Sequence, residues 1–207
     1  MSSREDILTA VREAMAGAPE APAPARDYRF TSGLSRDQLR EQLVDRLVDY
    51  KANVVILGSA SEIPEAVRTR LAGAERVVVP AGLDMAWTDE VEAEIVVDGP
   101  ERALSVEELD ATSAVLTASA AACSETGTIF LDTSADQGRR AITLVPDHHV
   151  VVVSMDDVRG LLPETLATLD STRPLTWISG PSATSDIELE RVEGVHGPRR
   201  LDVLLVG

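Results

Sequence analysis

NVVILGSASEIPEAVRTRLAGAERVVV, residues 53–79, contains the alternation that decides the fold. Two short β-branched runs, Asn53–Leu57 and Arg76–Val79, flank a segment, Glu62–Leu71, that has the apolar spacing of a helix. Further short apolar runs follow at Glu94–Val97 and Ala114–Thr117. Strands that alternate with helices form mostly parallel sheets, because each helix carries the chain back to the start of the next strand. The sequence therefore predicts an α/β domain whose mostly parallel sheet is flanked by helices.

The later part of the chain contains apolar runs that follow one another too closely for helical crossovers. They are Gly127–Leu131, Ile142–Val145 and Val150–Val153. This spacing predicts three strands in an antiparallel or meandering section. After them we expect a helix over Gly160–Leu169 and strands at Leu175–Ile178 and Leu201–Val206.

The first thirty residues have a different composition. Ser3 precedes an acidic first turn and an apolar stripe, which is typical of a short amphipathic helix. The Pro/Ala-rich stretch Gly17–Arg26 then predicts an extended linker. A second helix is expected from Ser35 onward, with Leu39, Leu43 and Leu47 on one face. We therefore expect a helical arm and linker over residues 1–33 and a single α/β domain over residues 34–207.

Composition and charge exclude several classes of function. Hydrophobic residues make up 44% of the 207 residues, which is enough for a core without disulfides. With 35 acidic against 19 basic residues the net charge is −16, and such a surface repels nucleic acid and anionic lipid. No signal peptide or membrane-spanning run is recognisable. We expect a cytoplasmic protein that binds neither nucleic acid nor membrane.

The sequence carries no recognisable signature of a bound cofactor. Cys123 is the single cysteine, and one thiol cannot hold an iron–sulfur cluster or a thiolate zinc site alone. The turn at Gly58-Ser-Ala-Ser lacks the Gly-x-Gly-x-x-Gly spacing of dinucleotide-binding proteins. We expect no metal and no cofactor on this chain.

The first candidate motif is Ala121-Ala-Cys-Ser-Glu-Thr-Gly-Thr128. Glu125 lies among small residues, and Gly127 lies where the chain enters a strand, so the carboxylate can face a ligand that approaches closely. The alternative is that Glu125 caps a helix or pairs with an arginine, and the residues alone do not separate the two.

The second candidate motif is Pro146-Asp-His-His-Val150. Adjacent residues on a strand point to opposite faces, so His148 and His149 are poorly placed to bind one metal together. One of the two histidines is better suited to hydrogen bonding or acid–base chemistry, because the unperturbed pKa of histidine is near 6.5.

Two further segments, Ser179–Glu188 and Gly194–Arg200, are rich in small and hydroxyl-bearing residues. Gly180 and Ser182 can supply backbone and hydroxyl donors to a carboxylate or phosphate. The alternative is a turn rich in capping residues, with Asp186 opening a short helix. The pairs Arg139-Arg140 and Arg199-Arg200 could bind a ligand carboxylate or form surface salt bridges.

Taken together, the four motifs resemble the lactate-utilisation C family, small proteins built on the LUD domain. The residues that carry the resemblance occur in the family's order and cover roughly Ala111 to the C-terminus. They are Ala-Cys-Ser-Glu125-Thr-Gly127-Thr, Pro146-Asp-His148-His149-Val, the run from Ser179 to Glu188, and Gly194-Val-His196-Gly-Pro198.

The resemblance implies a sheet of the type shared by ribose-5-phosphate isomerase, glucosamine-6-phosphate deaminase and coenzyme A transferases. It also implies a role in the oxidation of L-lactate to pyruvate, with iron–sulfur proteins as partners and a small carboxylate as ligand. Glu125 and His148 are then the expected catalytic residues, in one hollow with Ser182. The expected ligand-binding residues are Thr126, Gly127, Thr128, Ser179, Gly180, Ser182, Thr184, Asp186 and His196.

Two alternatives stay open from the sequence. One is a stand-alone acyl-transfer or isomerase-type enzyme that uses Glu125 as nucleophile or base. It is suggested by the glutamate that precedes a glycine in coenzyme A transferases of this fold class. The other is a non-catalytic assembly or regulatory module that reaches a partner through the N-terminal arm.

Overall fold

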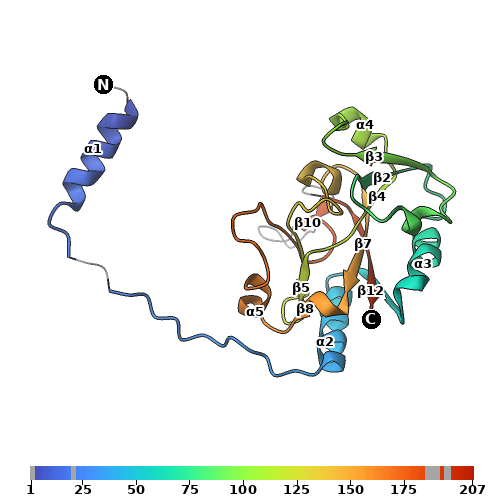
Figure 1. Ribbon diagram of the computed structural model, residues 1–207, viewed down its shortest axis with the longest axis horizontal. Coiled ribbons are helices and arrows are strands. Elements are labelled where there is room, and N and C mark those ends of the chain that lie inside the picture. The colour runs from blue at the N-terminus through green and yellow to red at the C-terminus, as the bar shows by residue number, and fades with distance from the viewer. Residues whose placement is uncertain (1–2, 20–21, 185–191, 194–196) are drawn as a thin grey trace.

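The computed structural model describes residues 3–19, 22–184, 192–193 and 197–207 (Figure 1). Five α-helices occur in these residues: α1 (Ser3–Met15), α2 (Arg36–Asp49), α3 (Ile63–Arg70), α4 (Val106–Asp110) and α5 (Leu162–Leu166). Local sequence explains where α2 and α4 begin. Ser35 and Gln38 form a reciprocal capping box at α2, and Ser105 and Glu108 do so at α4.

The main sheet has six strands, all parallel, in the order β1-β12-β7-β4-β2-β3. The strands are β1 (Asn53–Leu57), β2 (Arg76–Pro80), β3 (Glu94–Asp98), β4 (Ala114–Thr117), β7 (His148–Ser154) and β12 (Arg200–Val206). Central β7 and β12 pair over seven residues, with His149 opposite Leu201. The predicted α/β class with a mostly parallel sheet is confirmed.

A second sheet, in the order β8-β5-β6-β9, is built from the chain that follows β4. It consists of β5 (Ala121–Cys123), β6 (Thr128–Leu131), β8 (Val158–Arg159) and β9 (Thr176–Ile178). β6 pairs antiparallel with both β5 and β9. The expected antiparallel section therefore exists, although β7 lies in the parallel sheet. β10 (Ala183–Thr184) and β11 (Val192–Glu193) pair antiparallel in a separate two-stranded sheet.

The strand predicted at Ile142–Val145 is wrong. Arg140–Thr143 form a 3-10 helix, η3. The Thr143 hydroxyl donates to the Arg140 carbonyl, and the Arg140 guanidinium donates back to the Thr143 carbonyl, both at 3.2 Å. Such local side-chain bonds to the backbone give the chain an alternative to strand pairing.

Helices and the second sheet cover the two faces of the main sheet. On one face α3 and the 3-10 helix η2 (Met85–Thr88) pack over β2, β4, β7 and β12, with Val67 and Leu116 fully buried. On the other face α2 and the second sheet enclose a core that includes Leu43 and Val151. α5 packs on the outer side of the second sheet, against Phe130. The candidate site lies where the second sheet meets the main sheet.

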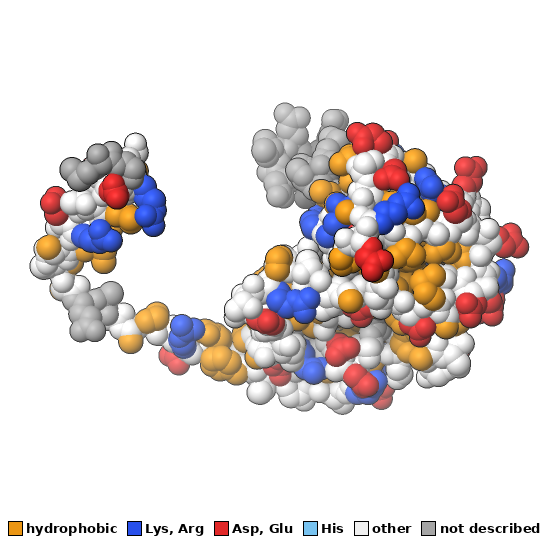
Figure 2. Space-filling model, turned by 45° about the horizontal axis from the view of Figure 1, so that its top comes forward, with side chains coloured by type: hydrophobic (Ala, Val, Ile, Leu, Met, Phe, Trp, Pro, Cys, Tyr) orange, Lys and Arg blue, Asp and Glu red, His pale blue; other side chains and the backbone are white. Residues whose placement is uncertain are grey.

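The N-terminal arm extends away from this body (Figure 1). No residue of α1 is buried, and Ile7, Val11 and Met15 expose 63%, 48% and 67% of their surfaces. Acidic and basic side chains are interspersed over the face of the body seen in Figure 2. None of the helices in the described ranges is long and apolar enough to cross a membrane.

Candidate functional site

A cavity of about 110 Å³ lies between the main sheet and the loop that follows β9. We call it the His149 cavity. His149 and Leu201, neighbours on β7 and β12, line it from the main sheet. The loop Ser179–Ser182 lines the opposite side, and Arg140 and Thr143 of η3 lie at its margin. Trp177, Ile178, Gly197 and Pro198 complete the lining.

His149 is a buried, uncharged imidazole in this cavity. Only 1% of the residue is exposed, and its Nε2 shares a hydrogen bond of 2.8 Å with the Thr117 hydroxyl at the end of β4. Burial, with smaller electrostatic contributions from His148 and Arg140, lowers the pKa of His149 from 6.5 to about 3. At neutral pH the ring can therefore donate or accept a hydrogen bond without carrying charge.

Arg140 brings a positive charge to the margin of the cavity. Its Nη1 donates to the carbonyl and the hydroxyl of Thr143, each at 3.2 Å. Burial lowers the pKa of the guanidinium, because charge is costly away from water. Among the residues that the structure describes, no carboxylate lies within ion-pair distance of Arg140. A cation in this position attracts an anionic ligand.

A chain of hydroxyl groups connects the loop to the glutamate motif. Thr128 Oγ1 lies 2.8 Å from Ser179 Oγ and 2.8 Å from Thr126 Oγ1. Three of the predicted ligand-binding residues are thus brought together. The backbone N–H of Ser182 donates to the Pro198 carbonyl at 2.8 Å, so that amide is occupied within the protein.

The two predicted glycines allow close packing against α2. Gly180 has φ +87°, and a Cβ there would lie 2.6 Å from the Cβ of Tyr50. Gly127 has φ +59°, and its Cβ would lie 2.6 Å from the Cβ of Arg46. Since these left-handed conformations and contacts suit only glycine, both residues fix the loops around the cavity.

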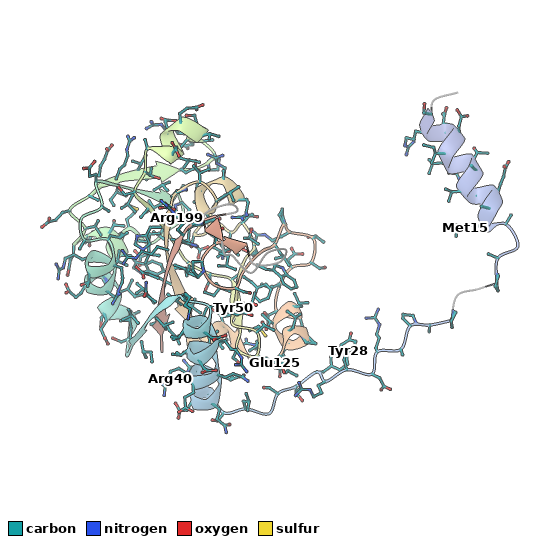
Figure 3. The ribbon with its side chains drawn as sticks, turned by 180° about the vertical axis from the view of Figure 1, so that it is seen from behind. Met15, Tyr28, Arg40, Tyr50, Glu125 and Arg199 are labelled. Carbon is teal, nitrogen blue, oxygen red and sulfur yellow. The ribbon has the colours of Figure 1, made fainter. Side chains whose placement is uncertain are left out.

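Glu125 does not line the His149 cavity. Its carboxylate accepts a hydrogen bond of 2.8 Å from Arg29 of the arm, and 42% of the side chain is exposed. Its carbonyl accepts a bond from Arg46 of α2. Figure 3 shows Glu125 beside α2, at the end of the body from which the arm leaves. The pairing with an arginine is the alternative that the sequence left open.

His148 faces away from His149, as their adjacent positions on a strand predict. It lines a separate cavity of about 270 Å³, the His148 cavity, together with Arg70, Gly73 and Arg200. The expectation that Glu125, His148 and Ser182 border one hollow is therefore wrong in the described structure. The physical reason is the strand alternation: from β7, His149 rather than His148 points toward the Ser179–Ser182 loop.

A buried carboxylate binds two of the side chains that line the His148 cavity. Asp202 is fully buried and accepts bonds from His148 Nε2 at 2.8 Å, Asn53 Nδ2 at 2.7 Å and Arg200 Nη2 at 2.7 Å. Burial alone would raise the pKa of Asp202. The hydrogen bonds from His148 and Asn53 outweigh burial, so the pKa lies below its usual value.

Some of the predicted ligand-binding residues lie outside the residues that the structure describes, and some residues that line the His149 cavity were not predicted. Asp186, His196 and the side chain of Thr184 lie outside the described residues. From the sequence, His148 rather than His149 was the expected catalytic residue, and Arg140 was one of several candidate arginines. The local sequence carries no signal that favours His149, because Val151 on its face of β7 and Val150 on the face of His148 are both buried core residues.

Comparison with known proteins now defines the class of protein. The LUD domain family is matched over residues 40–206. The chain belongs to this family of α/β proteins, and the resemblance found in the motifs is confirmed.

Individual relatives extend the match along the chain. Lactate utilization protein C of Deinococcus radiodurans is 49% identical over 207 residues, which cover 98% of this chain and 94% of that protein. A protein of the same name from Bacillus velezensis is 25% identical over 200 residues, covering 86% and 82% of the two chains. The crystal structure of a DUF162 family protein from Deinococcus radiodurans has a TM-score of 0.72 at 45% identity, covering 84% of this chain and 99% of that chain.

Proposed function

We propose that this protein is a component of an L-lactate utilisation system and binds a small hydroxy or keto acid, L-lactate or pyruvate, in the His149 cavity. Two relatives that bear the name Lactate utilization protein C, at 49% and 25% identity, support the system. The observation that carries the ligand class is Arg140, which has no carboxylate partner among the described residues and lies beside hydroxyl groups and a neutral imidazole.

The size of the cavity favours a three-carbon acid. An engineered cavity of about 150 Å³ in another protein binds benzene, which has as many non-hydrogen atoms as lactate. The His149 cavity is slightly smaller, at about 110 Å³. In the proposed complex the carboxylate binds the Arg140 guanidinium. The hydroxyl or keto oxygen then lies within reach of His149 and of the hydroxyls in the Ser179–Ser182 loop.

The proposed system includes iron–sulfur partner proteins in the cytoplasm. Oxidation of lactate to pyruvate releases two electrons, and this chain has one cysteine, Cys123, which is buried. An iron–sulfur cluster needs several cysteine ligands, so the electron-carrying clusters would be held by the partners. On this chain, the neutral His149 would form a hydrogen bond with the hydroxyl group of lactate, because its low pKa disfavours uptake of the proton itself.

Titration calorimetry with L-lactate and with pyruvate tests the ligand. We expect Arg140→Gln to weaken binding of both acids by roughly 10- to 100-fold, because a hydrogen bond to a charged group is lost. Arg102→Gln is the matched control, since Arg102 pairs with Glu108 on the surface, outside the His149 cavity. Equal affinity of the wild type and Arg140→Gln for both acids would refute the proposed site.

Lactate-dependent dye reduction with both iron–sulfur partners tests the system. We expect reduction to require this chain. Glu125→Gln and His148→Asn test the catalytic roles predicted from the sequence, and His149→Asn tests the contribution of the neutral imidazole proposed here. If dye reduction proceeds equally well without the chain, the proposed role in lactate oxidation is wrong.

A specific observation also favours an assembly role for the arm. Ile7, Val11 and Met15 recur every four residues of α1, so they share one side of a helix that buries none of its residues. An exposed apolar stripe of this kind is typical of a helix that binds a partner protein. Deletion of Met1–Arg26 should then abolish co-elution with the partners in size-exclusion chromatography. An unchanged elution profile would exclude the arm as the tether.

A further inference from the structure

A larger cavity lies at the carboxyl ends of β2 and β3. Its volume is about 540 Å³, within the range of roughly 300–1,000 Å³ common for small-molecule sites. Three segments form most of its lining: Ala81–Gly82 after β2, Asp98–Pro100 at the end of β3, and the chain from Thr133 after β6 to Arg140 at the start of η3. Ala103 and Pro174 complete it. Alanine, glycine and proline predominate in the lining, so most of the wall is apolar.

The sheet topology places this cavity beside the crevice in which α/β proteins bind ligands. β2 connects onward to β3 at the outer edge, whereas the chain after β4 continues to β7 on the opposite side. Adjacent strands whose connections diverge, here β2 and β4, leave a crevice at their carboxyl ends, and the cavity lies on the β3 side of this crevice. The loop between β6 and η3 borders this crevice, because Ala135 accepts a bond from Gly82 and Asp136 accepts one from Ala118. We call the space the switch-point cavity.

One wall of the switch-point cavity has a strained backbone. Thr133 has φ +62°, a left-handed conformation that β-branched residues rarely adopt. Neighbouring bonds fix it: its hydroxyl donates to the Asp132 carbonyl at 2.6 Å, and the Ser134 amide donates to the Asp132 carboxylate at 3.0 Å. Strained residues held in this way concentrate at ligand-binding and catalytic sites.

Two adjacent arginines of this loop differ in their partners. Arg139 donates to both oxygens of Asp98, at 2.9 and 2.7 Å, and to the Leu104 carbonyl at 2.6 Å. Its charge is therefore compensated, and the side chain forms part of the wall. Arg140 has no carboxylate partner within the described ranges, and it lines both the switch-point cavity and the His149 cavity. The apolar cavity thus has one uncompensated positive charge where it meets the smaller one.

We propose that the switch-point cavity binds an aromatic acid: a flat apolar ring system that fills the cavity and carries one carboxylate or phosphate group, which binds Arg140. An apolar wall favours burial of a ring, and the guanidinium selects its oxyanion. This ligand is distinct from the three-carbon acid of the His149 cavity, and the site goes beyond the proposed function. Arg140 would couple the two sites, since one guanidinium faces both ligands.

Titration calorimetry with four probes tests the proposal: 2-naphthoate, 2-naphthyl phosphate, the uncharged 2-naphthalenemethanol, and acetate. Ala103 is an exposed residue of the cavity wall, so Ala103→Trp fills the space without entering the core. We expect Ala103→Trp to weaken 2-naphthoate binding at least tenfold. Ala167→Trp, an exposed alanine at the end of α5, is the matched control and should leave binding unchanged.

The charge requirement is tested by Arg140→Gln. This variant should weaken 2-naphthoate binding by roughly 10- to 100-fold and leave the weaker binding of 2-naphthalenemethanol unchanged. A stronger response of 2-naphthyl phosphate than of 2-naphthoate would assign a phosphate ligand, and the reverse a carboxylate. Acetate binding should be insensitive to Ala103→Trp.

Failure of this proposal can be told apart from failure of the proposed function. Ala103→Trp should bind L-lactate as the wild type does, because Ala103 does not line the His149 cavity. The proposal is overturned if Ala103→Trp and wild type bind 2-naphthoate equally, or if Arg140→Gln weakens the neutral and the charged ring equally. Thermal unfolding of each variant confirms that it is folded.

Discussion

The His149 and His148 cavities lie on opposite faces of the same strand, and they treat charge differently. In the His148 cavity, the imidazole and Arg200 both bind the buried carboxylate of Asp202. In the His149 cavity, the imidazole is held uncharged, and Arg140 has no acidic partner among the described residues. A histidine beside an arginine thus stabilises the fold in the His148 cavity, whereas the same pair of residue types in the His149 cavity is proposed to bind a ligand. The deciding feature is whether the protein supplies the counter-charge itself.

Removal of Asp202 should have the largest effect on stability. Asp202→Ala leaves His148, Arg200 and Asn53 without their shared acceptor, and loss of one partner from a buried charged network costs about 3 kcal/mol. Urea unfolding at neutral pH measures the change. If the free energy of unfolding falls by less than about 1 kcal/mol, the His148 cavity is not held together by this carboxylate, and the contrast between the cavities fails.

Acid should destabilise the protein through His149. The unfolded chain binds a proton at His149 near pH 6.5, whereas the folded protein does not until about pH 3. The stabilising effect of a neutral His149 is therefore complete above pH 6.5 and decreases as the pH falls toward 3. Between pH 6.5 and pH 5 the loss is about 2 kcal/mol, at about 1.4 kcal/mol per pH unit.

His149→Asn isolates this contribution from those of other titrating groups. Asparagine keeps a polar partner for Thr117 and does not titrate. Urea unfolding of both proteins at pH 7 and pH 5 should show a smaller loss for the variant, by about 2 kcal/mol. Parallel pH profiles would mean that His149 is protonated in the folded protein, contrary to the uncharged imidazole described here.

Alanine substitutions at two glycines with similar positive φ angles compare how tightly the walls of the two cavities are packed. Gly180 in the His149 cavity and Gly73 in the His148 cavity have φ +87° and +82°. A Cβ at Gly73 meets nothing within 4 Å, whereas one at Gly180 would lie 2.6 Å from Tyr50. Gly73→Ala should cost about 1 kcal/mol from the backbone alone. Gly180→Ala should cost about 1 kcal/mol more, because the loop must move away from α2.

Thermal unfolding measures both costs, and calorimetry with L-lactate measures the consequence for binding. We expect Gly180→Ala to weaken lactate binding, since it displaces the Ser179–Ser182 loop, and Gly73→Ala to leave it unchanged. Equal costs for the two substitutions would show that the contact with Tyr50 is relaxed easily.

Most of the main sheet could be predicted from the sequence, because β1 to β4 and β12 are short apolar runs, whereas β7 was expected in the antiparallel section. The predicted strand at Ile142–Val145 failed because its composition resembles a strand, while Arg140 and Thr143 bond to the local backbone instead. The amino-acid composition of a segment indicates whether it is buried, but it does not indicate which groups form hydrogen bonds with its backbone.

The candidate site was harder to predict than the fold. The motifs that include Thr126, Thr128 and Ser179 do come together, joined by hydroxyl contacts of 2.8 Å. Glu125 was expected in the same hollow, but its carboxylate meets Arg29 of the arm. The choice between His148 and His149 depends on which face of β7 meets the second sheet. That sheet forms from residues distant in sequence, so no local pattern around the histidines fixes the answer.

Substitution of Arg140 should have the smallest effect on stability. A small effect is expected because Arg140, unlike the charged residues around Asp202, has no counter-charge among the described residues. Arg140→Gln removes a partly buried charge that no described carboxylate balances, so the free energy of unfolding should change by no more than about 0.5 kcal/mol. Arg139→Gln is the matched control at the adjacent position, because it leaves the Asp98 carboxylate without the guanidinium that binds both of its oxygens.

Since Arg139 is 41% exposed, solvent screening limits the expected loss for Arg139→Gln to about 1–2 kcal/mol. Urea unfolding of the two variants measures the difference. A loss for Arg140→Gln as large as that for Arg139→Gln would mean that Arg140 has a counter-charge within the protein. In that case the His149 cavity, like the His148 cavity, would be held together by its own charges, and it would have no unsatisfied cation to offer a carboxylate ligand.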